Sequence, residues 1–268
     1  MKIGIIGAME EEVQLLIKEM KVFSEEIIGM RTYYSGMLFN QDVVLAFSRW
    51  GKVAAASTVT TLIQKYNVDL VLFTGVAGAL NSSLNVGDIV IADNLTQYDM
   101  DVSGLPGFNK FEIPLLGKGF FSVDPALAKL AKKSAQYYLE NEMKQEINTE
   151  IINEFGLKNP QVIVGGIASG DQFVTDGRKI RNMFTADDYP QCVEMEGAAV
   201  AQVCYEHGVK YVVFRVISDK ADEHANIDFK KFIEHTASHF TKGIIKQIMM
   251  KLTPDILHSR KIIPSEPL

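Results

Sequence analysis

The stretch Asp69-Leu70-Val71-Leu72-Phe73-Thr74-Gly75-Val76-Ala77-Gly78 decides the fold class. Its first six residues form a near-continuous apolar run, which is typical of a strand that is covered on both faces. The small residues from Gly75 to Gly78 then predict a tight turn. A strand covered on both faces needs helices on both sides of its sheet, so helices are expected between the strands of this chain.

Strands and helices do alternate on either side of this run. Strands are predicted at 3–6, 32–38, 43–47, 86–92, 162–168 and 210–217. Helices are predicted at 9–20, 53–66, 125–139, 195–207 and 228–252, where apolar residues recur at helical spacing. A loop is expected at 103–118, which is rich in Gly and Pro, and an exposed hairpin is expected within 140–160.

This order predicts a single domain over residues 1–252, followed by a loose tail at 253–268 that contains three prolines. The domain is expected to be a three-layer α/β/α structure with a mixed, mostly parallel central sheet. In such folds the chemistry collects at strand ends and in the loops that follow them.

Composition excludes several classes of protein. The 268 residues are 47% hydrophobic and 22% charged, which is a globular and not a disordered composition. The net charge of −6 leaves no basic footprint, so we expect neither a nucleic-acid nor a membrane partner. Only Cys192 and Cys204 are present, which favours a reduced, cytoplasmic compartment.

Three glutamates, Glu10, Glu11 and Glu12, open the first predicted helix. Acids at a helix start complement the helix dipole, and this is the simplest interpretation of Glu10 and Glu11. Glu12 lies about 200° around the helix from Glu10, so at least one of the three must point toward the sheet.

Acids also occur at two later strand ends. In Val193-Glu194-Met195-Glu196, an acid can cap backbone N–H groups, which suits Glu194, while the other can be held in a pocket and bind paired sugar hydroxyls. Arg215 interrupts an apolar strand and must be paired there, because burying an arginine alone is very costly. Its expected partner is a carboxylate from another strand end. Ser218-Asp219 follows this strand and could form either a turn or part of a cleft.

No metal or cofactor is expected. His235 and His239 are four residues apart on a predicted helix, but no acidic motif accompanies them. The opening Gly4-Ile5-Ile6-Gly7 lacks the third glycine of a dinucleotide-binding turn.

Taken in order, the motifs resemble those of the bacterial 5′-methylthioadenosine/S-adenosylhomocysteine nucleosidases of the purine nucleoside phosphorylase superfamily. The resemblance covers Met1 to about Leu252. It rests on residues 4–12, 51–56, 74–75, 86–88, 169–173, 193–196 and 215–219. It implies a nucleoside phosphorylase-like fold and hydrolysis of the N-glycosidic bond between adenine and a 5′-thio-substituted ribose.

The resemblance also implies roles for individual residues. Glu12 matches the carboxylate that activates water, and Asp219, positioned by Ser218, matches the acid that protonates adenine N7. Glu196 matches the residue that binds the ribose hydroxyls. The other matching positions contact the base (Phe173 and the Val174 backbone), the sugar (Met195), the ribose and 5′-alkylthio pocket (Met9, Trp50 and Phe229) and the water (Arg215).

The chain departs from the family pattern at two positions. Val76 stands where relatives carry a serine that helps to hold water, and Trp50 replaces a small aliphatic residue beside the alkylthio pocket. The resemblance further implies a two-fold homodimer in which Val102, with Leu105 or Phe108, completes the neighbour's site. Apolar residues in a loop of this kind are typical of an interface.

Two other functions are compatible with these residues. A nucleoside phosphorylase of the same superfamily would need a phosphate site, which Glu12 and the absent hydroxyl at Val76 disfavour. A non-catalytic binding protein for adenine nucleosides would not need the acids Glu12, Glu196 and Asp219. Preference among methylthioadenosine, S-adenosylhomocysteine, 5′-deoxyadenosine and 6-amino-futalosine-type nucleosides stays open.

Overall fold

The computed structural model describes residues 1–223, 225–253 and 255–256. Its strands are β1 (Lys2–Gly7), β2 (Lys21–Ile28), β3 (Arg31–Leu38), β4 (Gln41–Phe47), β5 (Leu70–Phe73), β6 (Val76–Ala79), β7 (Ile89–Gln97), β8 (Phe120–Ser122), β9 (Val162–Ser169), β10 (Cys192–Glu194) and β11 (Lys210–Asp219). Its α-helices are α1 (Glu10–Glu19), α2 (Lys52–Gln64), α3 (Pro125–Asn141), α4 (Met143–Glu146), α5 (Thr149–Glu154), α6 (Gly177–Arg181), α7 (Gly197–Glu206), α8 (Ala225–Phe232) and α9 (Ser238–Lys251).

The strands form one mixed sheet in the order β2-β3-β4-β1-β5-β11-β6-β10-β9-β7-β8. The pairings from β4 through β1, β5 and β11 to β6 are parallel, whereas the outer pairs β2–β3, β3–β4 and β7–β8 are antiparallel. A further antiparallel pairing joins β11 to β7. The sheet therefore closes a ring through β11, β6, β10, β9 and β7.

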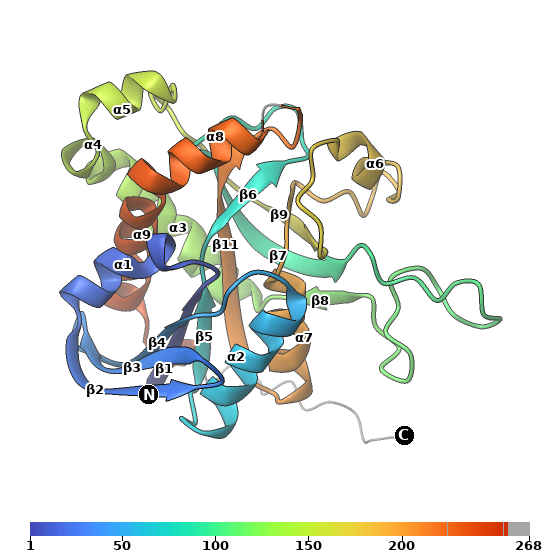
Figure 1. The fold of residues 1–268 in the computed structure, drawn as a ribbon, viewed down its shortest axis with the longest axis horizontal. Helices are drawn as coiled ribbons and strands as arrows, with labels where there is room; N and C mark the ends of the chain where they lie inside the picture. The colour runs from blue at the N-terminus through green and yellow to red at the C-terminus, as the bar shows by residue number, and fades with distance from the viewer. Residues whose placement is uncertain (224, 254, 257–268) are drawn as a thin grey trace.

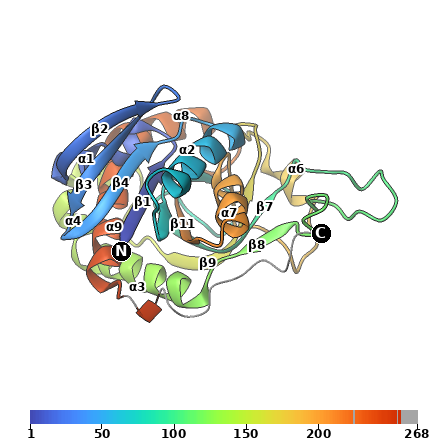
Figure 2. The ribbon, with the colours of Figure 1, turned by 90° about the horizontal axis from the view of Figure 1, so that it is seen from below.

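Helices cover the sheet on two sides (Figures 1 and 2). Helices α1 and α3 pack on α9 over one face, and α2 packs on α7 over the other. Helix α1 follows β1 in the connection that leads toward β4, on one side of β1 in the sheet. Helix α2 connects β4 to β5, on the other side of β1. Because the two connections cross the sheet in opposite directions, α1 and α2 lie on opposite faces. The predicted α/β class and single domain are confirmed.

Strand β5 is buried along its whole length, as its continuous apolar run predicts. The turn predicted for Gly75–Gly78 is wrong, because Val76–Ala79 is the buried strand β6 between β11 and β10. Its residues are small because neighbours approach closely. A Cβ at Gly78 would lie 2.8 Å from the Asp219 carboxylate.

Other differences from the sequence predictions have local causes. The edge strand β2 was not predicted, since a register shift between Val22 and Ser24 and two central glutamates obscure its alternation. The stretch 140–160 forms the short helices α4 and α5, not a hairpin, and buries Met143 and Ile152.

The helix predicted at 228–252 is two helices. Helix α8 begins at Ala225, and a π-helical turn at Ile233–Ala237 separates it from α9. Residues 103–118 form a loop, as predicted. Isolated bridges pair Asp101 with Lys110 and Ile113 with Lys118. Most of the predicted tail, from 257 onward, lies outside the described residues. Within the described part of the chain, every helix is too short or too polar to cross a membrane.

Candidate active site

A single cavity collects side chains from the ends of several strands and from the loops that follow them. It lies where β1 leads into α1, where β10 leads into α7 and where β11 ends. Its lining residues are Ala8, Met9, Glu12, Trp50, Val76, Ala77, Gly78, Gln172, Phe173, Val174, Val193, Glu194, Met195, Glu196, Ser218, Asp219 and Phe229.

Glu12 is the buried member of the three glutamates that open α1, while Glu10 and Glu11 are exposed. One carboxylate oxygen accepts hydrogen bonds from the backbone N–H groups of Ala8 at 2.6 Å and Met9 at 3.0 Å. The other accepts from the backbone N–H of Val76 at 3.2 Å. The side chain thus caps its own helix and joins it to β6.

Burial raises the pKa of Glu12 to about 7, although the charge of Arg215 and the three backbone donors oppose the increase. A carboxylate with a pKa near neutrality is matched to proton transfer at physiological pH. The environment of Glu12 therefore suits a general base.

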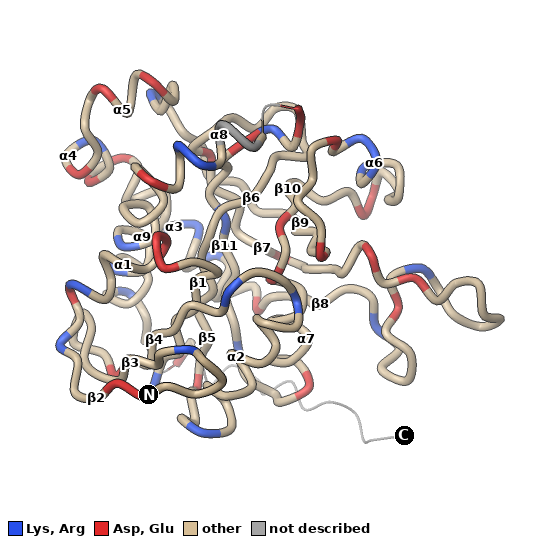
Figure 3. The backbone as a smooth tube through the Cα atoms, in the orientation of Figure 1, with Lys and Arg blue, Asp and Glu red and all other residues tan. Residues whose placement is uncertain are grey.

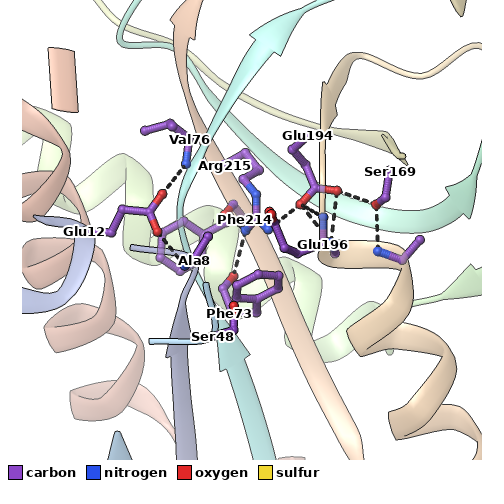
Figure 4. A network of polar contacts seen from close by, with 12 residues as sticks. Ala8, Glu12, Ser48, Phe73, Val76, Ser169, Glu194, Glu196, Phe214 and Arg215 are labelled. Atoms are coloured by element: carbon purple, nitrogen blue, oxygen red, sulfur yellow. Dashed lines mark hydrogen bonds and ion pairs between the residues drawn. The ribbon is translucent and has the colours of Figure 1, made fainter. Parts of the chain in front are cut away.

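Arg215 lies on β11 behind the cavity and does not line it. Its guanidinium is 2.5 Å from the Glu194 carboxylate and stacks on the Phe73 ring, with the guanidinium carbon 4.1 Å from the ring centroid (Figure 4). The prediction that Arg215 pairs with a carboxylate from another strand end is confirmed, because Glu194 ends β10.

Glu194 is the centre of this buried network. It accepts hydrogen bonds from the backbone N–H groups of Glu196 and Gly197 and from the Ser169 hydroxyl (Figure 4). It therefore caps the start of α7, as the sequence suggested for this acid, and also neutralises Arg215.

Glu196 lies at the N-terminus of α7 and is buried. One of its oxygens accepts a 2.8 Å hydrogen bond from the backbone N–H of Gly51. Burial and the neighbouring charge of Glu194 raise the pKa of Glu196 above its usual range. A second titratable carboxyl group thus stands in the same cavity as Glu12.

Asp219 ends β11 and is fixed from two sides. The Ser218 hydroxyl donates to one carboxylate oxygen at 2.8 Å, and the backbone N–H of Ala221 donates to the other at 2.9 Å. Both interpretations of Ser218-Asp219 are therefore correct, since the pair forms a local turn and lines the cavity.

Aromatic side chains form one wall of the cavity. The Phe173 and Phe229 rings meet edge to face, with centroids 5.4 Å apart, and Phe229 meets Trp50 in the same way at 6.3 Å. Phe173 and Trp50 are partly exposed. A flat ring can stack on such a wall.

The structure brings together every site residue predicted for one subunit except Arg215, which lies directly behind Glu194. Val102 is in the loop after β7 and does not line the cavity. Sequence reasoning did not assign Ser169 to the network, although Ser169-Gly170-Asp171 is one of the motifs that carry the resemblance. Its burial beside Glu194 was the missing information.

Charged groups elsewhere are mixed in sign. Basic and acidic residues are interspersed along the chain (Figure 3). Among the described residues, no three His, Cys, Asp or Glu side chains are grouped so that they could hold a metal ion.

Comparison with known proteins identifies relatives of this cavity-bearing fold. The model of the phosphorylase superfamily matches residues 2–249. A 5′-methylthioadenosine/S-adenosylhomocysteine nucleosidase of Bacillus cereus (strain G9842) is 36% identical over 246 residues, which cover 92% of this chain and 97% of the relative.

Solved structures agree. The nucleosidase of that name from Neisseria meningitidis, in complex with methylthio-immucillin-A, has a TM-score of 0.80 at 32% identity and covers 94% of this chain and 99% of its own. The Colwellia psychrerythraea enzyme, in complex with adenine, also has a TM-score of 0.80 at 32% identity, covering 93% of this chain and 95% of its own. The chain belongs to the 5′-methylthioadenosine/S-adenosylhomocysteine nucleosidase family of the phosphorylase superfamily.

Proposed function

We propose that this protein hydrolyses the N-glycosidic bond of 5′-methylthioadenosine and S-adenosylhomocysteine, releasing adenine and a 5-thio-substituted ribose. The observation that carries the proposal is the set of three carboxyl groups, Glu12, Glu196 and Asp219, that line one cavity beside an aromatic wall. The relatives named above act on these nucleosides.

The leaving group sets the first requirement. The adenine anion is a poor leaving group. A proton delivered to N7 lets adenine leave as a neutral base while positive charge grows on the ribose. Asp219, held by Ser218 and the Ala221 backbone, is the proposed donor. General acid catalysis of this kind contributes about 10²–10⁴-fold. Phe173 would stack on the base, and the Val174 backbone would bind its edge.

Water supplies the other half of the reaction. Glu12 would take a proton from the water that attacks the anomeric carbon, and its pKa of about 7 suits that task. Glu196 would bind the ribose hydroxyls, with Met195 against the sugar. Two carboxyl groups that flank an oxocarbenium-like sugar repeat the logic of glycoside hydrolysis.

The cavity favours hydrolysis over phosphorolysis. Every ionisable residue among those that line it is an acid, and Arg215 behind it is already paired with Glu194. A phosphate would meet like charge, and Val76 offers it no hydroxyl. A binding protein without catalysis would gain nothing from burying Glu12 at the desolvation cost that raises its pKa.

We extend the proposal to assembly and location. A two-fold homodimer would place Val102 at the neighbour's cavity, and the same loop exposes Leu105, whose side chain is 58% accessible in one chain. The unpaired thiols of Cys192 and Cys204 suit a reducing cytoplasm.

The test is adenine release from methylthioadenosine with and without phosphate. We expect free 5-methylthioribose at the same rate in both cases. Phosphate-dependent formation of a ribose 1-phosphate would make the protein a phosphorylase. Binding without adenine release would make it a non-catalytic protein.

A further inference from the structure

Trp50 stands at one end of the aromatic wall. Three rings of this wall form a row, Trp50, Phe229 and Phe173. The Trp50 ring contacts Phe229 edge to face, and Phe229 contacts Phe173 in the same way. If the base stacks on Phe173, Trp50 is at the opposite end of this row of rings, where the 5′ substituent of the sugar would lie. The backbone agrees, because the next residue, Gly51, donates its N–H to Glu196, the proposed ligand of the ribose hydroxyls.

The loop that carries Trp50 is fixed on both sides. Before it, the Ser48 N–H donates to the Gly7 carbonyl at 2.8 Å, and the Arg31 side chain donates to the Ser48 carbonyl at 3.0 Å. After it, the Lys52 N–H donates to Asp171 at 2.8 Å. The backbone that carries the indole is therefore held at the cavity, and the ring contacts Phe229, although Trp50 is 56% exposed to solvent. An uncovered, preorganised ring can bind an apolar group with little loss of entropy.

The residues around the cavity disfavour a 5′ substituent that carries both charges of an amino acid. All ionisable lining residues are acids. The nearest cations in the sequence are engaged, since Arg49 donates to the Met30 carbonyl and Lys52 pairs with Asp99 and lies near Asp171. An amino-acid tail carries both a carboxylate and an ammonium group. The acids can pair with the ammonium, but none of the lining residues is a cation that could pair with the carboxylate, and both charged groups would have to be desolvated against the indole.

We propose that Trp50 makes this enzyme selective for adenine nucleosides whose 5′-thio substituent is neutral and apolar, aryl groups above all, over those with an amino-acid tail. This inference rests on the proposed nucleosidase function. It assigns substrate specificity to a residue that takes no part in bond cleavage.

Kinetics with three substrates test it. We expect kcat/KM for 5′-phenylthioadenosine to exceed that for S-adenosylhomocysteine at least tenfold, with methylthioadenosine between them. Trp50→Ala should lower the phenylthio-to-homocysteine ratio at least fivefold, and Trp50→Phe should retain most of it. The control is Phe23→Ala, which removes a similarly exposed ring from β2, outside the cavity. A wild-type ratio near one, or a smaller fall in Trp50→Ala, overturns the inference while leaving the nucleosidase function intact.

Fluorescence gives a readout that does not need turnover, because Trp50 is the only tryptophan of the chain. Titration of the Asp219→Asn protein with 5′-phenylthioadenosine should shift the emission to shorter wavelength as the exposed indole is covered. Adenine alone should leave the emission unchanged. Equal responses to both ligands, or none to the nucleoside at saturation, would contradict the assigned position of Trp50. Failure of all substrates to release adenine would instead overturn the proposed function, and this titration would still decide the role of Trp50.

Discussion

The pH dependence of adenine release should report the ionisation of Glu12. Its carboxylate must be charged to accept a proton from water, and burial raises its pKa to about 7. The ionised fraction is then about one-tenth at pH 6 and about nine-tenths at pH 8, so kcat/KM should fall about tenfold for each pH unit below 7. If the pKa of Glu12 were that of an ordinary glutamate, kcat/KM would not change with pH down to about pH 5.

The assay is kcat/KM for adenine release from methylthioadenosine between pH 5 and 9. Glu12→Gln should lose at least about 10²-fold and show no acidic limb, because an amide cannot accept the proton. The matched control is Glu11→Gln, its exposed neighbour on the same helix, which should keep the wild-type profile.

Glu196 must be distinguished from Glu12, because burial raises its pKa too. Glu196→Gln should weaken binding of the ribose but keep an acidic limb near pH 7. The assignment of Glu12 as the base would be refuted if the acidic limb of the pH profile disappeared in Glu196→Gln but remained in the residual activity of Glu12→Gln.

The other predictions concern the acid, the buried ion pair, the stability of the fold and the assembly. Asp219→Asn should bind substrate but lose at least ~10²-fold in kcat, and retention of more than about a tenth would exclude it as the general acid. Arg215→Met should cost about 3–5 kcal/mol of unfolding free energy because it leaves the Glu194 charge buried without its partner. Adding Glu194→Gln should recover part of that cost, and a double variant whose cost equals the sum of the two single costs would show no coupling. Because the pKa of Glu12 is raised from 4.5 to about 7 on folding, the stability that its protonated form contributes is lost as the pH rises through about 7. The wild type should therefore lose roughly 2–3 kcal/mol of unfolding free energy relative to Glu12→Gln between pH 5 and pH 8 in urea unfolding. Sedimentation at micromolar concentration should give a dimer and Val102→Asp should weaken it, so a fully active monomer would exclude the shared site.

The alternation of apolar strands with helices predicted the fold class because each local pattern agrees with the parallel arrangement. The ring closure was not predictable in the same way. It depends on the pairing of Phe214–Val216 with Ile89–Ile91, which are distant in the sequence and equally apolar, so no local pattern distinguishes this pairing from the others. The π-helical turn at Ile233–Ala237 was not predicted for a different reason, because an amphipathic pattern does not reveal one extra residue in a turn.

The site was easier to predict than its connections. A charge within an apolar strand must have a partner or a function, which singles out Arg215 from the sequence alone. Glu12 follows two other glutamates, and its role was predicted from the helix geometry and the family resemblance. The choice between Glu194 and Glu196 as the partner of Arg215 depends on side-chain direction at the end of a three-residue strand, and the spacing leaves it open. The edge-to-face contact between Trp50 and Phe229 joins a loop after β4 to α8, so only the folded chain shows it.

The small residues of the stretch that decides the fold also explain how the two proposed catalytic carboxyl groups find room in a packed interior. A Cβ at Gly75 would lie 2.8 Å from one Glu12 oxygen, and a Cβ at Gly78 would lie 2.8 Å from one Asp219 oxygen. Between these glycines, the Val76 N–H donates to Glu12. The segment Gly75–Gly78 thus packs against both the proposed acid and the proposed base. Its small residues, which the sequence analysis interpreted as a turn, leave the space that two buried carboxyl groups need.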